Sequence, residues 1–213
     1  VIVNGLDPIL HAELKPLIDC QPGFTLEHES DYGFPPGTIN LEGFRHLRTV
    51  TNEHLCESFA RVLGVEVDIS KPWLKVPGDS YFPISVAVIN ITQRYRDKLF
   101  NWEREIAWLK AKYHNVSFLG LRDEYEPFAG LCHFERSGDF LEAAQMIKKA
   151  RIFSGTQSAL LTIAQGIGMP YRVERSPFHS AGITHRLNET ILNPHSRKLY
   201  FFFSRIKQVI DHV

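Results

Sequence analysis

A short polar run between a predicted strand and a predicted helix is the part of this sequence best suited to chemistry. Residues 154–158 read Ser-Gly-Thr-Gln-Ser, after an apolar strand-like stretch and before "ALLTIAQGIG". Gly155 permits a sharp turn, and a helix that begins at Thr156 or Gln157 leaves its first amides, through Ser158, unpaired. Those amides and the helix dipole favour a phosphate or diphosphate. The alternative is an ordinary capped connection.

Arginine recurs in the loops that follow predicted strands. Five such loops are polar and four of them contain arginine, which suggests an anionic ligand because the guanidinium fork matches phosphate oxygens. In the first loop, residues 90–98, Arg94 and Arg96 are placed to clamp a diphosphate from the side opposite the helix, next to Asn90 and Thr92. The alternative is a solvated basic turn.

Glu174 ends the strand that follows the Ser-Gly-Thr-Gln-Ser helix. A carboxylate at this position can accept hydrogen bonds from ribose hydroxyls. The alternative is a surface glutamate paired with Arg172 or Arg175.

Several kinds of site are not indicated. The three cysteines are far apart, and the ten histidines form no HxH or HExxH pattern, so no metal site is predicted. There is no Gly-x-Ser-x-Gly elbow, Walker loop or GxGxxG fingerprint. We expect no cofactor and leave the catalytic residues unassigned.

Short strands and helices alternate after residue 83, which predicts a Rossmann-like α/β fold, a parallel sheet with helices on both faces. Ligands of such sheets bind beyond the carboxyl ends of the strands. The expected strands are 84–91, 116–121, 132–136, 151–155, 170–175 and 189–193, and the expected helices are 101–113, 139–150, 158–168 and 196–213.

The first half has weaker patterns. We expect strands at 1–5, 23–30, 39–43 and 65–69 and helices at 9–20 and 51–64. The run "KVPGDSYFP", residues 75–83, predicts a boundary, with a reduced α/β lobe over 1–82 and a Rossmann-like lobe over 83–213 that the family resemblance described below implies to be the nucleotide-sugar-binding one.

Bulk composition limits the partners. The 213 residues carry no formal net charge, which argues against binding nucleic acid through a broad basic field. No apolar run approaches the ~18 residues that a membrane-spanning helix needs, and no signal peptide is evident. We expect a cytoplasmic protein.

The order of these patterns from Ile84 to Pro194 resembles the carboxyl-terminal lobe of GT-B glycosyltransferases, and most of all the ADP-heptose:lipopolysaccharide heptosyltransferase-like group. That group has an aspartate-initiated helix, a strand, a Gly-x-(Asp/Gln)-Ser turn and a Gly-x-Pro stop. The matching residues are Asp139, Ala143, Ile147, Ala150, Gly155, Gln157 and Ser158.

The resemblance implies a metal-independent enzyme of the hexosyl- or heptosyltransferase type. Its ADP-, GDP- or UDP-linked sugar would have the base and ribose near the fourth and fifth loops and the diphosphate at the helix behind residues 154–158. The acceptor, a glycan, lipid or protein, is not specified. Glu29 and Asp31 are candidates for the catalytic base.

This sequence departs from the group in two ways. Gly-Thr-Gln-Ser stands where Asn-Asp-Ser-Gly is usual, so the donor is expected to differ, and the first half is too short to match the group's first lobe, as in a fragment or a reduced lobe. The alternative function is a non-catalytic nucleotide or sugar-nucleotide binding module. A nucleotide-sugar epimerase is a third interpretation.

Overall fold

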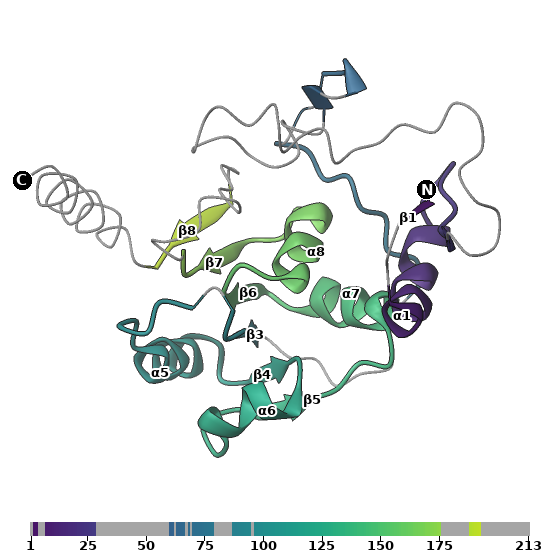
Figure 1. The fold of residues 1–213 in the computed structure, drawn as a ribbon. Helices are drawn as coiled ribbons and strands as arrows, with labels where there is room; N and C mark the ends of the chain where they lie inside the picture. Colours follow the sequence, from purple (N-terminus) through teal and green to yellow (C-terminus); the bar gives the residue numbers. More distant parts are fainter. Residues whose placement is uncertain are drawn as a thin grey trace, which may run out of the picture.

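The computed structural model describes residues 2–3, 7–28, 60–61, 63–66, 68, 70–78, 87–94, 96–175 and 188–192. Its main feature is a six-stranded sheet in which every neighbouring pair is parallel (Figure 1). The strands are β3 (Ala87–Asn90), β4 (Val116–Leu119), β5 (His133–Glu135), β6 (Ile152–Gly155), β7 (Tyr171–Val173) and β8 (Glu189–Ile191). A separate parallel pair joins β1 (Ile2–Val3) to β2 (Glu27–His28).

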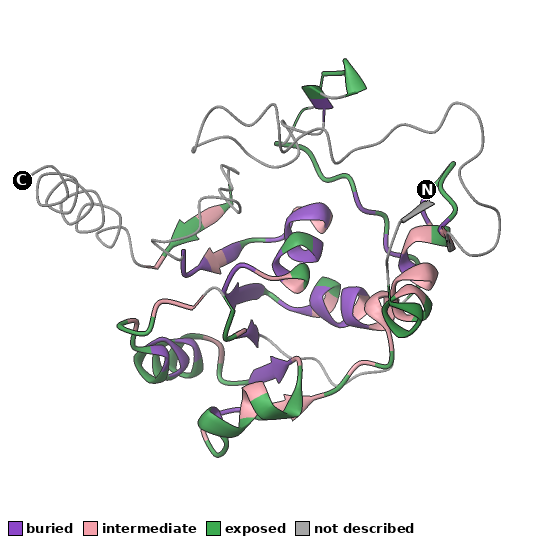
Figure 2. Cartoon of the chain, viewed as in Figure 1, coloured by how far each residue is buried: buried purple, intermediate pink, exposed green. Residues whose placement is uncertain are grey.

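The sheet order is β5-β4-β3-β6-β7-β8. Counted from β3, this is the 3-2-1-4-5-6 order of the Rossmann fold. Every residue of β3, β4 and β6 is buried, as expected of parallel strands covered on both faces (Figure 2). The predicted Rossmann-like parallel sheet is therefore confirmed.

Helices cover both faces of the sheet. On one face, α7 (Phe140–Lys149) and α8 (Ala159–Ile167) pack against Val88, Phe153 and Tyr171, and α1 (Pro8–Asp19) packs on α7. On the other face, α5 (Trp102–Tyr113) packs against Ile89 and Phe118. The short α6 (Arg122–Tyr125) and the 3-10 helix η2 (Glu126–Phe128) connect β4 to β5.

Side chains cap the first turns of two of the helices. Asn101 Oδ1 accepts a hydrogen bond from Arg104 N–H (2.9 Å), and Asp139 Oδ1 accepts one from Glu142 N–H (2.8 Å). Helix α8 ends at Gly168, whose φ of 81° is left-handed.

Two described segments of the first half, α1 and residues 73–76, pack on the helices that cover one face of the sheet. The backbone N–H groups of Trp73 and Leu74 both donate to Gly166 O at 2.9 Å, and Lys148 Nζ donates to Val76 O at 2.9 Å. Leu17, Leu74 and Val76 share one apolar cluster with α7 and α8. The division after residue 82 stays a prediction.

Some predicted elements differ or are not described. The strand predicted at 65–69 is wrong, because Val65, Glu66 and Asp68 belong to no strand. The helix at 51–64 is helical at 60, 61 and 63 and lies otherwise outside the described residues, as do the predicted elements at 39–43 and 196–213. No helix in the described part is both long enough and apolar enough to cross a membrane.

Candidate functional site

The candidate site lies where the chain leaves β3 and β6 in opposite directions. These two strands are neighbours at the centre of the sheet, and the strand order reverses between them. Open α/β sheets bind ligands in the crevice beyond the carboxyl ends of the strands at such a point.

A cavity of about 700 Å³ opens at this edge of the sheet. It is lined by Asn90 and Thr92 after β3, residues 120–124 after β4, residues 136–140 before α7 and residues 158–160 at the start of α8. Its volume lies within the range of small-molecule and cofactor pockets, about 300–1,000 Å³.

Helix α8 presents its first amides to this cavity. The helix begins at Ala159 and not, as predicted, at Thr156 or Gln157. Ser158 Oγ caps it by accepting a hydrogen bond from Leu161 N–H (3.2 Å). The N–H groups of Ala159 and Leu160 precede the first intrahelical bonds, and both residues line the cavity. An anion at this position would meet two amide donors and the positive end of the helix dipole.

Thr156 joins β6 to the end of β3 and the loop that follows it, a structural role that was not predicted. Its N–H donates to Asn90 O (3.0 Å), and its Oγ1 accepts a hydrogen bond from Thr92 N–H (2.9 Å). Thr156 is fully buried. Its amide is therefore used inside the protein, and the expectation that it stays unpaired is wrong.

Gly155 is required by packing between strands. A Cβ at this position would lie 2.4 Å from Asn90 O and 3.0 Å from the Phe153 ring. The absence of a side chain at Gly155 thus allows β6 and β3 to approach closely.

We expect Gly155→Ala to lower the free energy of unfolding by about 1–3 kcal/mol, because the methyl group must displace backbone at the centre of the sheet. Urea denaturation measures this change. Gly130→Ala is the control for added methyl volume, since nothing lies within 4 Å of a Cβ there, although its positive φ adds strain of its own. If Gly130→Ala lowered the free energy of unfolding more than Gly155→Ala does, the packing explanation would be contradicted.

Only part of the predicted set lines the cavity, namely Asn90, Thr92 and Ser158. Arg94 is exposed and outside the lining. Arg96 is also outside it, with its guanidinium 5.5 Å from the Phe128 ring centroid. Gln157 is mostly buried and does not contribute either.

Glu174 lies beneath the site without lining it. It is fully buried, and its Oε1 accepts a hydrogen bond from Asp97 N–H (2.9 Å), which holds the loop after β3 against β7. Burial raises the pKa of Glu174 to about 7, and the nearby Arg96 guanidinium opposes that shift. Its Oε2 is buried and has no hydrogen-bond partner among the described residues, and its contact with a ribose stays a prediction.

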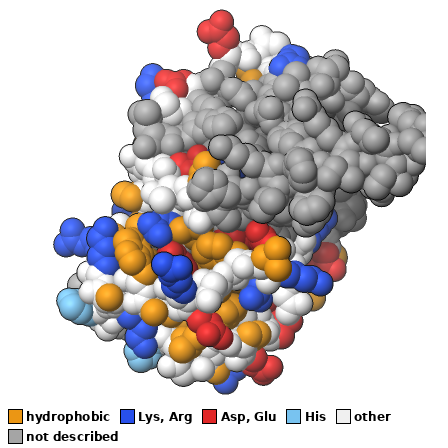
Figure 3. All heavy atoms as spheres, turned by 90° about the vertical axis from the view of Figure 1, so that its left-hand side faces the viewer, with side chains coloured by type: hydrophobic (Ala, Val, Ile, Leu, Met, Phe, Trp, Pro, Cys, Tyr) orange, Lys and Arg blue, Asp and Glu red, His pale blue; other side chains and the backbone are white. Residues whose placement is uncertain are grey.

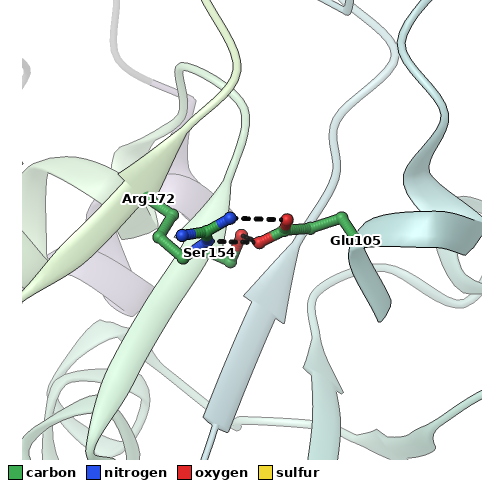
Figure 4. A network of polar contacts seen from close by, with 3 residues as sticks. All are labelled: Glu105, Ser154 and Arg172. Carbon is green, nitrogen blue, oxygen red and sulfur yellow. Dashed lines mark hydrogen bonds and ion pairs between the residues drawn. The ribbon is translucent and has the colours of Figure 1, made fainter. Parts of the chain in front are cut away.

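The alternative pairing of Glu174 with Arg172 or Arg175 is also wrong. Arg172 forms two hydrogen bonds with the Glu105 carboxylate, at 2.6 and 2.9 Å, and Ser154 Oγ donates to the same carboxylate at 3.0 Å (Figure 4). Arg175 pairs with Glu189. The Glu105–Arg172 pair fixes α5 against the sheet. Ser154, which donates to the same carboxylate, directly precedes Gly155.

The cavity contains charged residues that the predicted set omitted. Arg122 and Arg136 line it, together with the carboxylates of Asp123 and Glu124. The Arg122 guanidinium stacks 5.1 Å from the Phe134 ring centroid. These residues belong to loops at the predicted edge of the sheet, and the recurrence of arginine in those loops is the signal that could have found them.

An amide nitrogen and a carboxylate oxygen flank Gly120 in the cavity lining. A Cβ there would lie 2.8 Å from Asn90 Nδ2 and 3.4 Å from Glu124 Oε2. Asn90 Nδ2 donates to Leu119 O (2.8 Å), while the buried Asn90 Oδ1 has no hydrogen-bond partner among the described residues. Burial raises the pKa of Glu124. The lining thus offers the Glu124 carboxylate to a ligand with hydroxyl groups, while the Asn90 amide oxygen is buried.

No group of three or more His, Cys, Asp or Glu side chains in the described ranges is arranged to hold a metal ion. The cavity chemistry therefore consists of amide and guanidinium donors with carboxylate and amide acceptors.

Comparison with known proteins relates this fold to glycosyltransferases. No model of a protein family matches the sequence, and no curated protein matches it. Among solved structures, the chain is similar to the iron-containing dodecameric glycosyltransferase TibC from enterotoxigenic E. coli H10407, with a TM-score of 0.60 and 14% identity over 84% of this chain and 52% of that one.

It is similar also to the heptosyltransferase TibC in complex with ADP-D-beta-D-heptose, with a TM-score of 0.52 and 13% identity over 78% of this chain and 46% of that one. This chain thus spans about half the length of the TibC chains. The likeness establishes that the chain has the α/β fold seen in these heptosyltransferase structures.

Proposed function

We propose that this chain binds the nucleotide-sugar donor of a glycosyltransfer reaction in the cavity between β3 and α8. The observation that carries the proposal is the coincidence, at the switch point of a Rossmann-ordered sheet, of free helix amides and a pocket of about 700 Å³. The fold shared with TibC, one structure of which holds ADP-D-beta-D-heptose, supports it.

Each part of the donor has a complementary group in the cavity. The diphosphate would accept hydrogen bonds from the amides of Ala159 and Leu160 and from Arg122 or Arg136. The ribose hydroxyls would donate to the Glu124 carboxylate. The sequence predicts the base near the fourth and fifth loops, and within this cavity the Phe134 ring of β5 is an aromatic surface on which a base would stack.

The reaction proposed for the complete site is metal-independent transfer. The bond between the sugar anomeric carbon and the diphosphate oxygen breaks, a bond to the acceptor oxygen forms, and the acceptor proton passes to a carboxylate base. The helix amides and arginines would stabilise the charge on the departing diphosphate. Glu29 and Asp31 lie outside the described residues, whereas Glu13 of α1 is a described carboxylate of the first half that lines the cavity.

We expect ADP, GDP or UDP to bind the protein, and Arg122→Ala to weaken that binding by about 1.5–3 kcal/mol, or roughly ten- to a hundredfold in Kd. Isothermal titration calorimetry measures the affinities. Arg94→Ala is the matched control, since Arg94 belongs to a neighbouring loop and lies outside the cavity. An equal loss in both variants would contradict the proposed position of the diphosphate.

Activity assays on the same protein distinguish an enzyme from a non-catalytic binding module. Both functions require nucleotide binding, but only the enzyme releases free sugar or transfers it from a nucleotide sugar. Turnover that survives EDTA would support metal independence, and binding without any turnover by the full-length protein would favour the non-catalytic module. Absence of binding by all three nucleotides would refute the proposal.

A further inference from the structure

A second hollow lies at the opposite edge of the sheet, where β4 and β5 begin. It has a volume of about 330 Å³ and lies among the end of α5, the start of β4 and residues 130–134. Phe134 is the one residue that lines both this hollow and the donor cavity. The hollow is thus a separate space, away from the loops that would hold a nucleotide.

The described lining of this hollow is entirely neutral or basic. Lys110, His114 and His133 line it, and no carboxylate does. None of these three side chains has a hydrogen bond or ion pair with another described residue. Burial raises the pKa of the Cys132 thiol to about 11, so this lining group adds no negative charge near neutral pH.

His114 is held in a strained backbone conformation beside this hollow. Its φ of 67° and ψ of −52° make it the one described non-glycine residue with positive φ. Asn115 N–H donates to Tyr113 O (2.8 Å), which closes a γ-turn of the rare positive-φ kind. Strain of this kind persists only where the surroundings enforce it, and it is common at functional sites.

We propose that this hollow binds a small ligand that carries a phosphate or carboxylate group, held by Lys110, His114 and His133. The rings of Tyr125 and Phe134 form a wall for the rest of the ligand. Tyr125 is itself fixed, because its hydroxyl donates to Cys132 O (3.1 Å). Figure 3 faces the side of the molecule on which α5 lies and shows histidine side chains beside lysine and arginine at its lower edge.

The ordinary alternative for Lys110 is that it complements the negative end of the α5 dipole. Lys112 offers the matched control, since it lies in the same last turn but contacts the rings of Trp108 and Tyr113. A dipole role would make the two lysines equivalent, whereas a ligand role would not.

The test is an NMR titration of the protein with inorganic phosphate and, separately, with benzoate. We expect saturable shifts of the amides at 110, 114 and 133 with at least one anion, weakened about fivefold or more in Lys110→Ala and unchanged in Lys112→Ala. The stronger of the two anions identifies the chemical group. No saturable shift with either anion, or equal weakening in both lysine variants, would overturn the proposal.

His114→Gly separates binding from folding. Glycine adopts positive φ without strain, so the variant is expected to melt at the wild-type temperature or above while its anion affinity falls about fivefold or more. Its affinity for nucleotides in the donor cavity is expected to stay unchanged. Wild-type anion affinity in this variant would exclude His114 from the site.

Discussion

Replacing Glu105 with alanine is expected to lower the free energy of unfolding by about 3–5 kcal/mol, the usual result when one partner of a buried ion pair is removed. The side chains of Glu105 and Arg172 are only 6% and 17% exposed. Without the carboxylate, the Arg172 guanidinium stays against the Trp108 ring, 3.9 Å from its centroid, with no counter-charge, and Ser154 loses its acceptor.

Urea denaturation of Glu105→Ala and Glu103→Ala tests this expectation. Glu103 is an exposed acidic residue in the first turn of the same helix, and its removal is expected to cost less than about 1 kcal/mol. Similar losses in the two variants would show that the buried pair contributes no special stability.

A double variant isolates the charge effect. Leucine at both 105 and 172 removes the buried charges together, and it is expected to lose less stability than Glu105→Ala alone. A larger loss in the double variant would attribute the effect to packing on Trp108 and not to the uncompensated guanidinium.

The second large effect is expected from Glu174→Gln, as a change in the pH dependence of stability. Because burial raises the folded-state pKa of Glu174 to about 7, above its usual value, ionising this group favours unfolding. Its contribution to stability is full below its unfolded-state pKa and is lost as the pH rises toward 7. Relative to the glutamine variant, the wild type should lose on the order of 3 kcal/mol between about pH 4.5 and about pH 8.

Denaturation of both proteins across this pH range measures the difference directly, because the other titrating groups are common to both and cancel. Glutamine retains an oxygen that can accept the hydrogen bond from Asp97 N–H, so the loop after β3 should keep its position. A difference that does not change with pH would mean that Glu174 titrates as an ordinary exposed glutamate. If the wild type instead became more stable relative to Glu174→Gln as the pH rises, the attraction between Glu174 and Arg96 would outweigh the effect of burial on the pKa.

Local sequence signals predicted most of the elements that build the sheet. The runs predicted as strands at 84–91 and 116–121 became β3 and β4, and Asn101, Asp139 and Gly168 lie at the ends of their helices as expected. These signals are reliable because a cap or a buried strand depends on residues only a few positions apart. The strand predicted at 65–69 is not formed, since Val65, Glu66 and Asp68 belong to no strand.

The site was harder to predict from the sequence. Its place at the carboxyl edge of a parallel sheet was predicted, because the alternation of strands and helices implies that edge. The choice among loops was not, since Arg94 and Arg122 look alike in sequence and only one of them lines the cavity.

The sequence by itself thus determined the fold class, the capped helices and the set of loops in which a ligand site must lie. The tertiary structure alone decided that Thr156 and Gly155 join β6 to β3, that Glu174 is buried, and that Arg172 pairs with Glu105. The physical reason is distance along the chain. Caps and strands arise from neighbouring residues, whereas burial, ion pairing and cavity lining depend on groups that the strand order brings together from segments 49 to 77 residues apart.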